Sequence, residues 1–574
     1  AQAPARPARG AAGSGDARLR ALYTAEWAWR RRADGAEDDA DGAERGGGDR
    51  LPRVDAAWQQ ERLAYWTRTL AALDAIPLDR LSEEARVDAQ VFRAVLAANV
   101  TDARYRTYEA PFNSDTFFWT AFTPRQGFAR VDEYRRYLAR LRDVPRHFAD
   151  QTANMRAGLA RGYTVPRVAV LGRDRTIEPY LAADTTNPLW TPLARMPATI
   201  PAAARDSLRA EARAVLGEVV VPAYARLLAF VREEYLPGAR TTLAARALPD
   251  GPAYYRAMIA KFTTLDLPPD SIHRIGLAEV ARLRAAMERT MRAAGFAGTL
   301  AEFFAFLRTD PQFYAKTPRE LLAYSAYVAK KADLALARTI GFLPRHRHGI
   351  VPVPAALAPI YTGGRGGFEA CQMNTYDLPA RPLYTLAALT LHECTPGHSF
   401  QAALAREGPP RPPFRRTASF SGYGEGWGLY SEWLGHEMGI YETPYEEFGQ
   451  LTYEMWRACR LVIDTGIHEY GWTREQAIDY LRAHAALSEH EITTEVDRYI
   501  AWPGQALAYK LGELQIRRHR AEAEAALGAR FDQRAFHDAI LALGSVPLPV
   551  LEERMRRFVA EGGSAAASAA AVVP

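Results

Sequence analysis

Cysteine is scarce in this chain of 574 residues, which contains only three. Three widely separated thiols cannot make a cysteine-rich zinc cluster, because such sites use several cysteines at short spacings. An excess of one charge sign is also lacking, since 72 Lys and Arg against 67 Asp and Glu give a net charge of +5. Nucleic-acid-binding proteins usually concentrate positive charge on one face. The short basic runs at 517–520 and 554–557 are typical of solvated helix faces instead, so we expect no nucleic acid as a partner.

Long apolar runs are lacking too. No stretch reaches the roughly 20 apolar residues that a helix needs to cross a bilayer, so we expect no transmembrane segment. The first residues, Ala-Gln-Ala, are typical of the new N-terminus that remains when a signal peptide is removed at a small-residue site. This start and the Ala/Arg-rich composition favour a periplasmic or secreted bacterial protein, made with a signal peptide that this chain does not contain.

Runs with strand character are few, at 167–171 and around 366–378, and helical periodicity dominates. We therefore expect a mainly α fold. Apolar residues recur at helical spacing in the stretches 58–76, 81–99, 131–161, 202–235, 270–294, 300–307, 318–340, 444–470, 473–486, 494–525 and 532–543.

The two ends of the chain differ from the rest. Residues 1–16 are rich in Ala, Pro and Gly and predict a flexible N-terminal segment. Residues 561–574 are small and predict a disordered tail. Between them, 17–560 is expected to form a single large helical domain of two lobes, which divide near 237–252 and enclose a cleft.

The most informative motif is Leu-His-Glu-Cys-Thr-Pro-Gly-His-Ser-Phe-Gln, residues 391–401. Zinc hydrolases combine two imidazole ligands with a Glu that takes a proton from water at the metal. Here His392 and His398 are six residues apart, which on a straight helix would leave the rings roughly 120° apart. Pro396 cannot donate to the carbonyl of His392, so the helix must bulge or break there. Two looped-out residues would bring His398 back over His392, with Glu393 as the base.

A third ligand is expected on another helix, in Tyr-Gly-Glu-Gly-Trp-Gly-Leu-Tyr-Ser-Glu, residues 423–432. Glu425 lies between two glycines, and Glu432 lies on the same helical face about two turns later. One would bind the metal and the other would brace a ligand imidazole as a hydrogen-bond acceptor. We favour Glu425 for the metal and Glu432 for the brace. A solvated helix start with acidic residues near the positive dipole end is the alternative.

Together with Asp-Thr-Gly-Ile-His at 464–468 and Arg-Tyr-Ile-x-x-Pro-Gly-Gln-Ala-Leu-x-Tyr-Lys at 498–510, these motifs resemble a large bacterial family catalogued as domain of unknown function 885. That family is similar in layout to helical zinc peptidases of the angiotensin-converting-enzyme and oligopeptidase kind. The resemblance implies a large two-lobed helical body with a central cleft and a small β-ribbon beside the metal helix. It also implies zinc bound by two histidines of one helix and a glutamate of a following helix. The departure from those peptidases is the wider histidine spacing.

The segment 366–378 precedes the metal helix and is expected to form a short strand. An exposed strand edge beside a metal can hydrogen-bond an extended peptide, and the similar peptidases have an edge strand at this place. Gln372, Met373 and Asn374 are therefore candidate substrate contacts. An ordinary ribbon that packs the preceding loop is the alternative.

A set of hydrogen-bond donors follows in the last third of the chain: Arg460, His468, Arg498, Tyr499, Gln505, Tyr509 and Lys510. A Tyr hydroxyl or a protonated imidazole can stabilise the oxyanion of peptide hydrolysis, and we choose Tyr499 and His468 for this role. Arg498, Gln505 and Lys510 are candidate substrate-binding residues, since Arg and Lys can hold a carboxylate. Alternatively, Arg498 pairs with Glu495 on the helix surface and Lys510 is solvated.

Three further groups are set aside. His484, His490 and Glu491 lie on a plain amphipathic helix, and His346 and His348 read as a basic loop tip. Cys394 is expected to fill a small buried gap beside the site.

The resulting hypothesis is a zinc-dependent peptidase in which Glu393 is the general base. A cleft between the lobes would restrict its substrates to short or unfolded peptides. Two alternatives remain open. The same site could hydrolyse a non-peptide amide or an ester, or the protein could be a binding protein with a degenerate metal site.

Overall fold

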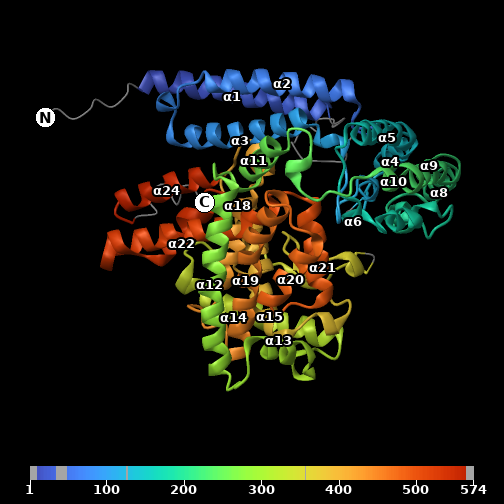
Figure 1. Cartoon of the computed structure of the whole chain (residues 1–574). Helices are drawn as coiled ribbons and strands as arrows, with labels where there is room; N and C mark the ends of the chain where they lie inside the picture. The colour runs from blue at the N-terminus through green and yellow to red at the C-terminus, as the bar shows by residue number, and fades with distance from the viewer. Residues whose placement is uncertain (1–8, 34–47, 125–126, 356, 564–574) are drawn as a thin grey trace. The chain divides into compact units, whose positions relative to one another are not determined.

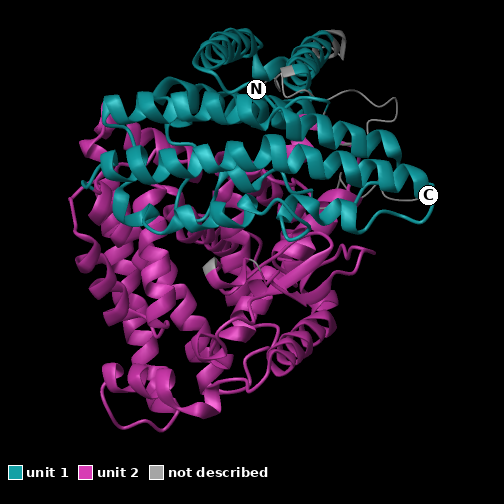
Figure 2. Ribbon diagram, turned by 90° about the vertical axis from the view of Figure 1, so that its right-hand side faces the viewer, with its two compact units in different colours: residues 1–242 teal, residues 243–574 magenta. Residues whose placement is uncertain are grey.

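The computed structural model describes residues 9–33, 48–124, 127–355 and 357–563. The chain is mainly helical, as expected (Figure 1). It divides into two compact units, residues 1–242 and 243–574 (Figure 2). The division lies inside the range 237–252, and a single catalytic domain with a shared cleft stays a prediction.

Unit 1 begins with three long helices that contact one another, α1, α2 and α3. Asp55 and Ser82 cap α2 and α3 by accepting hydrogen bonds from backbone N–H groups of the first turns. The helices of this unit are α1 (Arg9–Ala33), α2 (Ala56–Asp74), α3 (Glu83–Tyr105), α4 (Val131–Arg142), α5 (Val144–Arg161), α6 (Arg167–Val170), α7 (Thr191–Ala194), α8 (Ala202–Val215), α9 (Val221–Phe230) and α10 (Leu236–Gly238).

The last three helices of unit 1 form one continuous stretch, Ala202–Gly238, with two π-helical segments at Leu216–Val220 and Val231–Tyr235. Each π segment precedes a proline, Pro222 or Pro237, which cannot donate the usual helical hydrogen bond. Among the described residues, this is the one helix that is long and apolar enough by composition to cross a membrane. Half of its most apolar window is buried inside the protein, and buried core helices have the same composition, so it is weak evidence for a span.

Unit 2 is built around α19, which is buried from Phe448 to His468 except at Leu451. Thr443 and Glu446 form a capping box at its start, with Pro444 in the first turn. Helices α12 and α15 pack along α19, and α18 packs against α22 and α15. The helices of this unit are α11 (Gly251–Thr263), α12 (Pro269–Ala293), α13 (Leu300–Thr309), α14 (Pro318–Thr339), α15 (Leu383–Glu393), α16 (His398–Glu407), α17 (Pro413–Thr417), α18 (Ser421–Leu434), α19 (Pro444–His468), α20 (Arg474–His484), α21 (Glu489–Ala501), α22 (Ala508–Leu527), α23 (Gln533–Leu541) and α24 (Leu548–Ala560).

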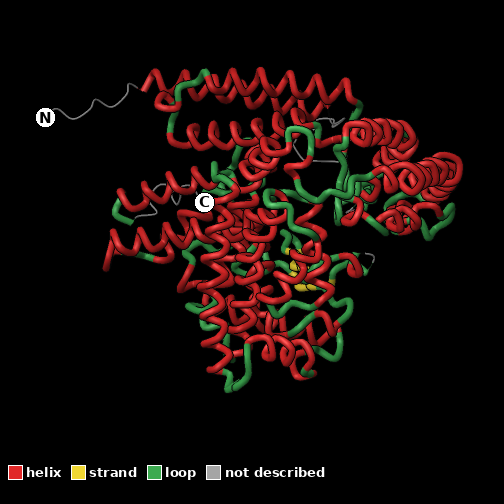
Figure 3. The backbone as a smooth tube through the Cα atoms, in the orientation of Figure 1, coloured by secondary structure: helices red, strands yellow, loops and turns green. Residues whose placement is uncertain are grey.

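One small sheet lies among the helices of unit 2 (Figure 3). Its strands are β1 (Gly349–Pro352), β2 (Gly364–Arg365) and β3 (Ala370–Met373), in the order β1-β3-β2. Strand β3 pairs with β1 in parallel and with β2 antiparallel, so β3 is the central strand and β2 is an edge.

Several expectations need correction. Stretch 131–161 divides between α4 and α5 at Asp143, and 494–525 divides between α21 and α22 at a turn that contains Pro503 and Gly504. Stretch 167–171 contains the short helix α6 in place of a strand. At the N-terminus, residues 1–8 lie outside the described residues, but the flexible segment predicted to residue 16 is wrong from Arg9 on, where α1 begins. Of the predicted tail 561–574, only residues 561–563 are described.

A buried ion-pair network joins α12, α19 and α22. The Lys510 ammonium is fully buried and lies 2.8 Å from Glu454, 2.9 Å from Glu513 and 3.1 Å from Glu279. Arg282 and Arg517 also pair with Glu454, so three cations face three carboxylates. The substrate role predicted for Lys510 is therefore wrong, because all of these contacts are internal to the helix packing.

We predict that Lys510→Met lowers the free energy of unfolding by about 3–5 kcal/mol, because it leaves buried carboxylates without their partner. Urea unfolding monitored by circular dichroism measures the effect. Lys330→Met is the matched control, since the Lys330 side chain is 83% exposed and its loss should change stability by less than about 0.5 kcal/mol. Equal stability of the two variants would contradict a structural role for Lys510.

Candidate metal centre

The helix that carries the metal motif breaks where the sequence predicts. Helix α15 ends at Glu393 and α16 begins at His398, and the peptide bond between Thr395 and Pro396 is cis. The rings of His392 and His398 lie 4.8 Å apart between centroids. The loop is fixed from outside by the Trp427 indole, which donates to the carbonyl of Pro396 at 2.8 Å.

Two glycines allow this close packing around His392. A Cβ at Gly397 would lie 1.8 Å from the carbonyl oxygen of His392, which is impossible. A Cβ at Gly428 of α18 would lie 2.7 Å from the His392 ring, so only glycine lets α18 approach this imidazole. Gly428 of the Glu-Gly-Trp-Gly motif therefore serves the His392 site directly, whereas Gly426 of the same motif packs against Gly512 of α22.

Helix α18 brings a carboxylate to both imidazoles. Glu425 Oε2 lies 3.4 Å from Nε2 of His392 and 3.2 Å from Nε2 of His398. The three donor atoms lie within 4.8 Å of one another, as a shared metal ion requires. Two imidazoles and one carboxylate are a ligand set that catalytic zinc uses, with a fourth position for water or substrate. The donor chemistry therefore fits zinc.

Glu432 lies where the sequence predicts a hydrogen-bond acceptor that braces a ligand imidazole. Its Oε1 lies 2.8 Å from Nδ1 of His392, and its side chain is fully buried. This contact fixes the orientation of the ring and leaves Nε2 directed at Glu425, as outer carboxylates do for zinc-binding histidines. Arg457 lies 3.5 Å from the same oxygen of Glu432 and balances its charge. The arrangement matches the favoured assignment of Glu425 and Glu432, and metal binding itself stays a prediction.

The electrostatics of the cluster keep it charged. Burial alone would lower the pKa of His392, but hydrogen bonds to Glu425 and Glu432 outweigh burial and raise that pKa to about 9. Burial alone would raise the pKa of Glu425, but the two imidazoles hold it well below its usual range. Glu425 is thus ionised, which is the form that binds a cation, and a metal ion must displace a proton from His392.

Glu393 is held beside an edge of the small sheet. Its Oε2 accepts a hydrogen bond from the backbone N–H of Gly366 at 2.5 Å, directly after β2. The expectation that Gln372, Met373 and Asn374 form an exposed edge is wrong, because they belong to or follow the central strand β3. Met373 is fully buried, and the Asn374 amide donates to three loop carbonyls. The edge nearest to the base is β2.

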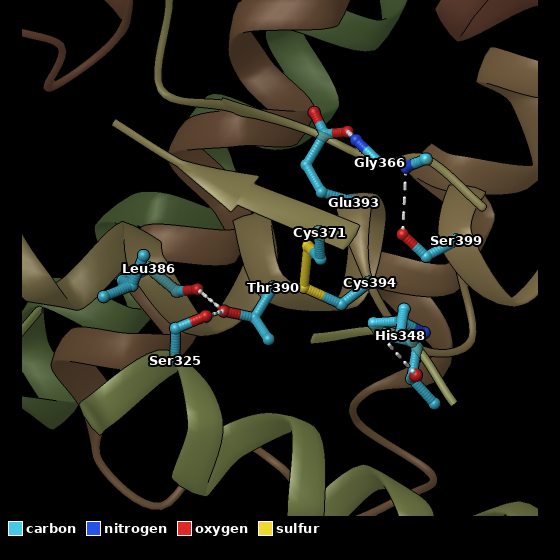
Figure 4. Close-up of a disulfide and its surroundings, with 11 residues drawn as sticks. Ser325, His348, Gly366, Cys371, Leu386, Thr390, Glu393, Cys394 and Ser399 are labelled. Atoms are coloured by element: carbon cyan, nitrogen blue, oxygen red, sulfur yellow. Dashed lines mark hydrogen bonds between the residues drawn. A yellow bond between two sulfur atoms is a disulfide. The ribbon is translucent and has the colours of Figure 1, made fainter. Parts of the chain in front are cut away.

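A disulfide joins this sheet to residues 394–397, the loop between α15 and α16, which we call the metal loop. Cys371 of β3 is bonded to Cys394, the residue after Glu393 (Figure 4). The Glu393 side chain extends from the same loop towards Gly366, and Ser399 Oγ accepts from the N–H of Gly367 at 3.1 Å. The prediction that Cys394 only fills a gap is wrong, because its partner Cys371 lies 23 residues earlier, beyond any local motif.

Both residues that were predicted to stabilise the oxyanion, His468 and Tyr499, have other partners in the structure. His468 is fully buried, with Nδ1 accepting from the N–H of Ala245 and Nε2 2.8 Å from the carbonyl of Tyr499. The Tyr499 hydroxyl accepts from Trp456 at 2.7 Å and from Arg460 at 3.0 Å inside the core. These contacts hold α19 and α21 together, so the structure gives both residues a role in helix packing.

Tyr509 lies beside His392, one of the candidate metal ligands. Its ring stacks on that of His392, with 6.4 Å between centroids and planes 17° apart. Arg498 donates to the Tyr509 hydroxyl at 3.3 Å and to Gln505 Oε1 at 3.0 Å. Arg498 and Gln505, both predicted as substrate contacts, are therefore joined to Tyr509. The sequence placed Tyr509 among the donors but gave no reason to prefer it to Tyr499, because their distances from His392 depend on the turn at Gly504.

Comparisons with known proteins give a family and a fold. A sequence profile of the family described as "Bacterial protein of unknown function (DUF885)" matches residues 39–555. The crystal structure of a candidate lipoprotein from Colwellia psychrerythraea superimposes with a TM-score of 0.87 at 27% sequence identity, over 95% of this chain and 99% of that one. A candidate lipoprotein of unknown function from Shewanella oneidensis has a TM-score of 0.69 at 17% identity, over 94% and 98%. No curated protein matches the chain significantly.

We predict that zinc affinity of the metal-free protein rises between pH 6 and about 9. His392 carries a proton below its pKa of about 9, zinc needs that lone pair, and binding at pH 7 must release the proton. Calorimetric titration in buffers of different ionisation enthalpy measures the release. His398→Ala should lose stoichiometric zinc, whereas His484→Ala, whose ring contacts the carbonyl of Tyr480, should retain it. Zinc affinity that is constant from pH 7 to 9 would contradict the proton displacement.

A second prediction concerns the disulfide. Replacing Cys371 and Cys394 together by Ala should lower the free energy of unfolding by about 3 kcal/mol, because the cross-link closes a loop of 23 residues in the unfolded chain. Chemical unfolding measures the change. Cys459→Ala is a control for the removal of a buried thiol that is not cross-linked. A double variant as stable as the wild type would show that the cross-link adds nothing.

Proposed function

The chain belongs to the bacterial DUF885 family, and from the geometry of its site we propose that it is a zinc-dependent peptidase. The observation that carries the proposal is the convergence of His392, His398 and Glu425, with Glu393 next to the first ligand. The placing of these ligands on successive helices is similar to that in helical zinc peptidases, and this likeness is part of the proposal.

The three ligands and the base have separate tasks. A zinc ion held by His392, His398 and Glu425 would polarise the substrate carbonyl and lower the pKa of water at the site towards about 7. Glu393 accepts the proton of the attacking water and then delivers it to the leaving amine. The N–H of Gly366 holds one carboxylate oxygen of Glu393 and leaves the other to take the proton.

Tyr509 is proposed as the group that stabilises the oxyanion. Its hydroxyl accepts a hydrogen bond from Arg498, so its own proton can be donated to the developing negative charge. The guanidinium of Arg498 strengthens this donor, and Gln505 keeps the guanidinium in place. His468 and Tyr499, which the sequence favoured for oxyanion stabilisation, have no role in the proposed mechanism.

A peptide is favoured over a small amide or ester by the neighbouring strand. Strand β2 is an edge of the sheet, and the residue after it holds Glu393, so an extended peptide that adds to this edge would bring its backbone to the base. The side chains of His398 and Glu425 are only 22% and 23% exposed. Such a recessed site favours short or unfolded peptides over folded protein surfaces.

The proposed location is outside the cytoplasm. Disulfides such as Cys371–Cys394 form and persist mainly in oxidising compartments. The two similar structures are named as candidate lipoproteins, which agrees with this location. We propose a periplasmic or secreted peptidase.

We predict that Glu393→Gln lowers kcat by a factor of about 10²–10⁴, because the amide cannot accept the proton. Zinc should remain bound at one ion per chain, since Glu393 is not a ligand. Cleavage of a library of short peptides, measured with metal content by atomic absorption, tests both points. An active Glu393→Gln enzyme would end this mechanism. Wild-type protein that binds no zinc and cleaves no peptide would leave only a binding function.

We also predict that Tyr509→Phe lowers kcat by about 10²–10³ with little change in KM, because the lost donor acts in the transition state. Tyr499→Phe is the matched control. It removes a hydroxyl of the core and should lower stability with little loss of kcat. A larger loss of kcat in Tyr499→Phe than in Tyr509→Phe would indicate that Tyr499 stabilises the oxyanion.

A further inference from the structure

A cavity lies beside the metal loop. It has a volume of about 300 Å³ and lies within unit 2, between α14, the segment 344–350 and the start of α16. Thr395, in the loop between the two metal-binding histidines, lines it. Figure 4 shows His348 and Glu393 on opposite sides of the disulfide. The cavity is thus separate from the proposed active site and shares one loop with it.

The polar part of the cavity wall is basic and partly fixed. His346 stacks on Phe368 with 3.9 Å between centroids, and its Nε2 lies 2.7 Å from the carbonyl of Phe368. His348 Nε2 lies 3.5 Å from Oγ1 of Thr395. Arg347 is anchored through Nη1 to the carbonyl of Pro344 at 2.9 Å. The expectation that these histidines form a simple basic loop tip is wrong, because both are half-buried in the cavity wall.

The charged and apolar side chains that line the cavity indicate a class of ligand. The lining contains two cations, Lys330 and Arg347, and one carboxylate, Asp333, which lies 3.2 Å from Lys330, so apart from the histidines it has one net positive charge. The rest of the lining is apolar: Ala326, Ala329, Pro344, Ile350, Phe400 and Ala403. A volume of 300 Å³ is at the lower end for small-molecule sites.

We propose that this cavity binds a small organic monocarboxylate with a short apolar group. The carboxylate lies against Arg347, Lys330 and His348, and the apolar group lies on Phe400 and the alanines. The planar guanidinium of Arg347 can form two hydrogen bonds to a carboxylate. The apolar part of the lining disfavours inorganic anions, which have no apolar group to place there.

A ligand in the cavity would touch the segment that carries His398. Thr395 and Phe400, which line the cavity, lie three residues before and two residues after His398 in the sequence.

The experiment is calorimetric titration of the metal-free full chain with N-acetyl-L-leucine, with N-acetyl-L-leucinamide as the uncharged probe. Metal-free protein is used so that the carboxylate cannot bind to zinc. We expect saturable binding of the acid and at least tenfold weaker binding of the amide. Arg347→Gln should weaken binding about ten- to a hundredfold, as for loss of a charged hydrogen bond. Ala329→Phe should abolish binding by filling the cavity.

Arg345→Gln is the matched control, because Arg345 is 94% exposed on the same segment and does not line the cavity. It should bind the acid like the wild type. Thermal melting checks that each variant is folded, and Lys330→Gln, at an exposed position, replaces any variant that is not. The proposal is overturned by absence of saturable binding up to about 10 mM, by equal binding of acid and amide, or by unchanged binding in Arg347→Gln or Ala329→Phe.

Discussion

The interruption of one helix at Pro396 is the constraint on which the site depends. Without it, His392 and His398 would point in directions roughly 120° apart, and no single carboxylate could reach both. With it, four residues separate the end of α15 from the start of α16, and the two imidazoles face Glu425. The surrounding elements stabilise this interruption. The Trp427 indole donates to the carbonyl of Pro396, Gly428 leaves room for the His392 imidazole, and a disulfide bonds Cys394 to the sheet.

Charge compensation is the second principle of unit 2. Buried carboxylates are frequent around α19, and three of them lie next to cationic side chains. Glu432 faces His392 and Arg457, Glu495 faces Arg460, and Glu454 faces Lys510. Burying one ionised group alone costs much more free energy than burying it beside an opposite charge. The helices of this core must therefore pack so that each of these carboxylates meets its own partner. The same residue types are used in the metal cluster, where the carboxylates and imidazoles would share a cation.

Local chemistry made much of this predictable. The helical character and the break at Pro396 that turns His398 towards His392 follow from periodicity, from the missing N–H of proline and from helix geometry. Glu425 was inferred from the need for a third ligand and from its two flanking glycines, and it lies within reach of both imidazoles. Features that depend on contacts far apart in the chain were not predictable. The strand order makes β3 central, the turn at Gly504 places Tyr509 and not Tyr499 against His392, and Cys371 meets Cys394 through the packing of the sheet on the loop. Lys510 was misjudged for the same reason, since its partners come from α12 and α19 as well as from its own helix.

The position of the disulfide also bears on how the protein is handled. Cys394 lies one residue from the proposed base and two residues from the first proposed ligand, so the cross-link is part of the frame of the site. Protein made in a reducing cytoplasm would lack this covalent connection between sheet and loop. A thiol reductant in the buffer would act twice, by opening the bond and by competing for a soft metal ion. Such a reagent therefore changes both the cross-link and the metal content of the site, and it should be omitted whenever metal content is compared.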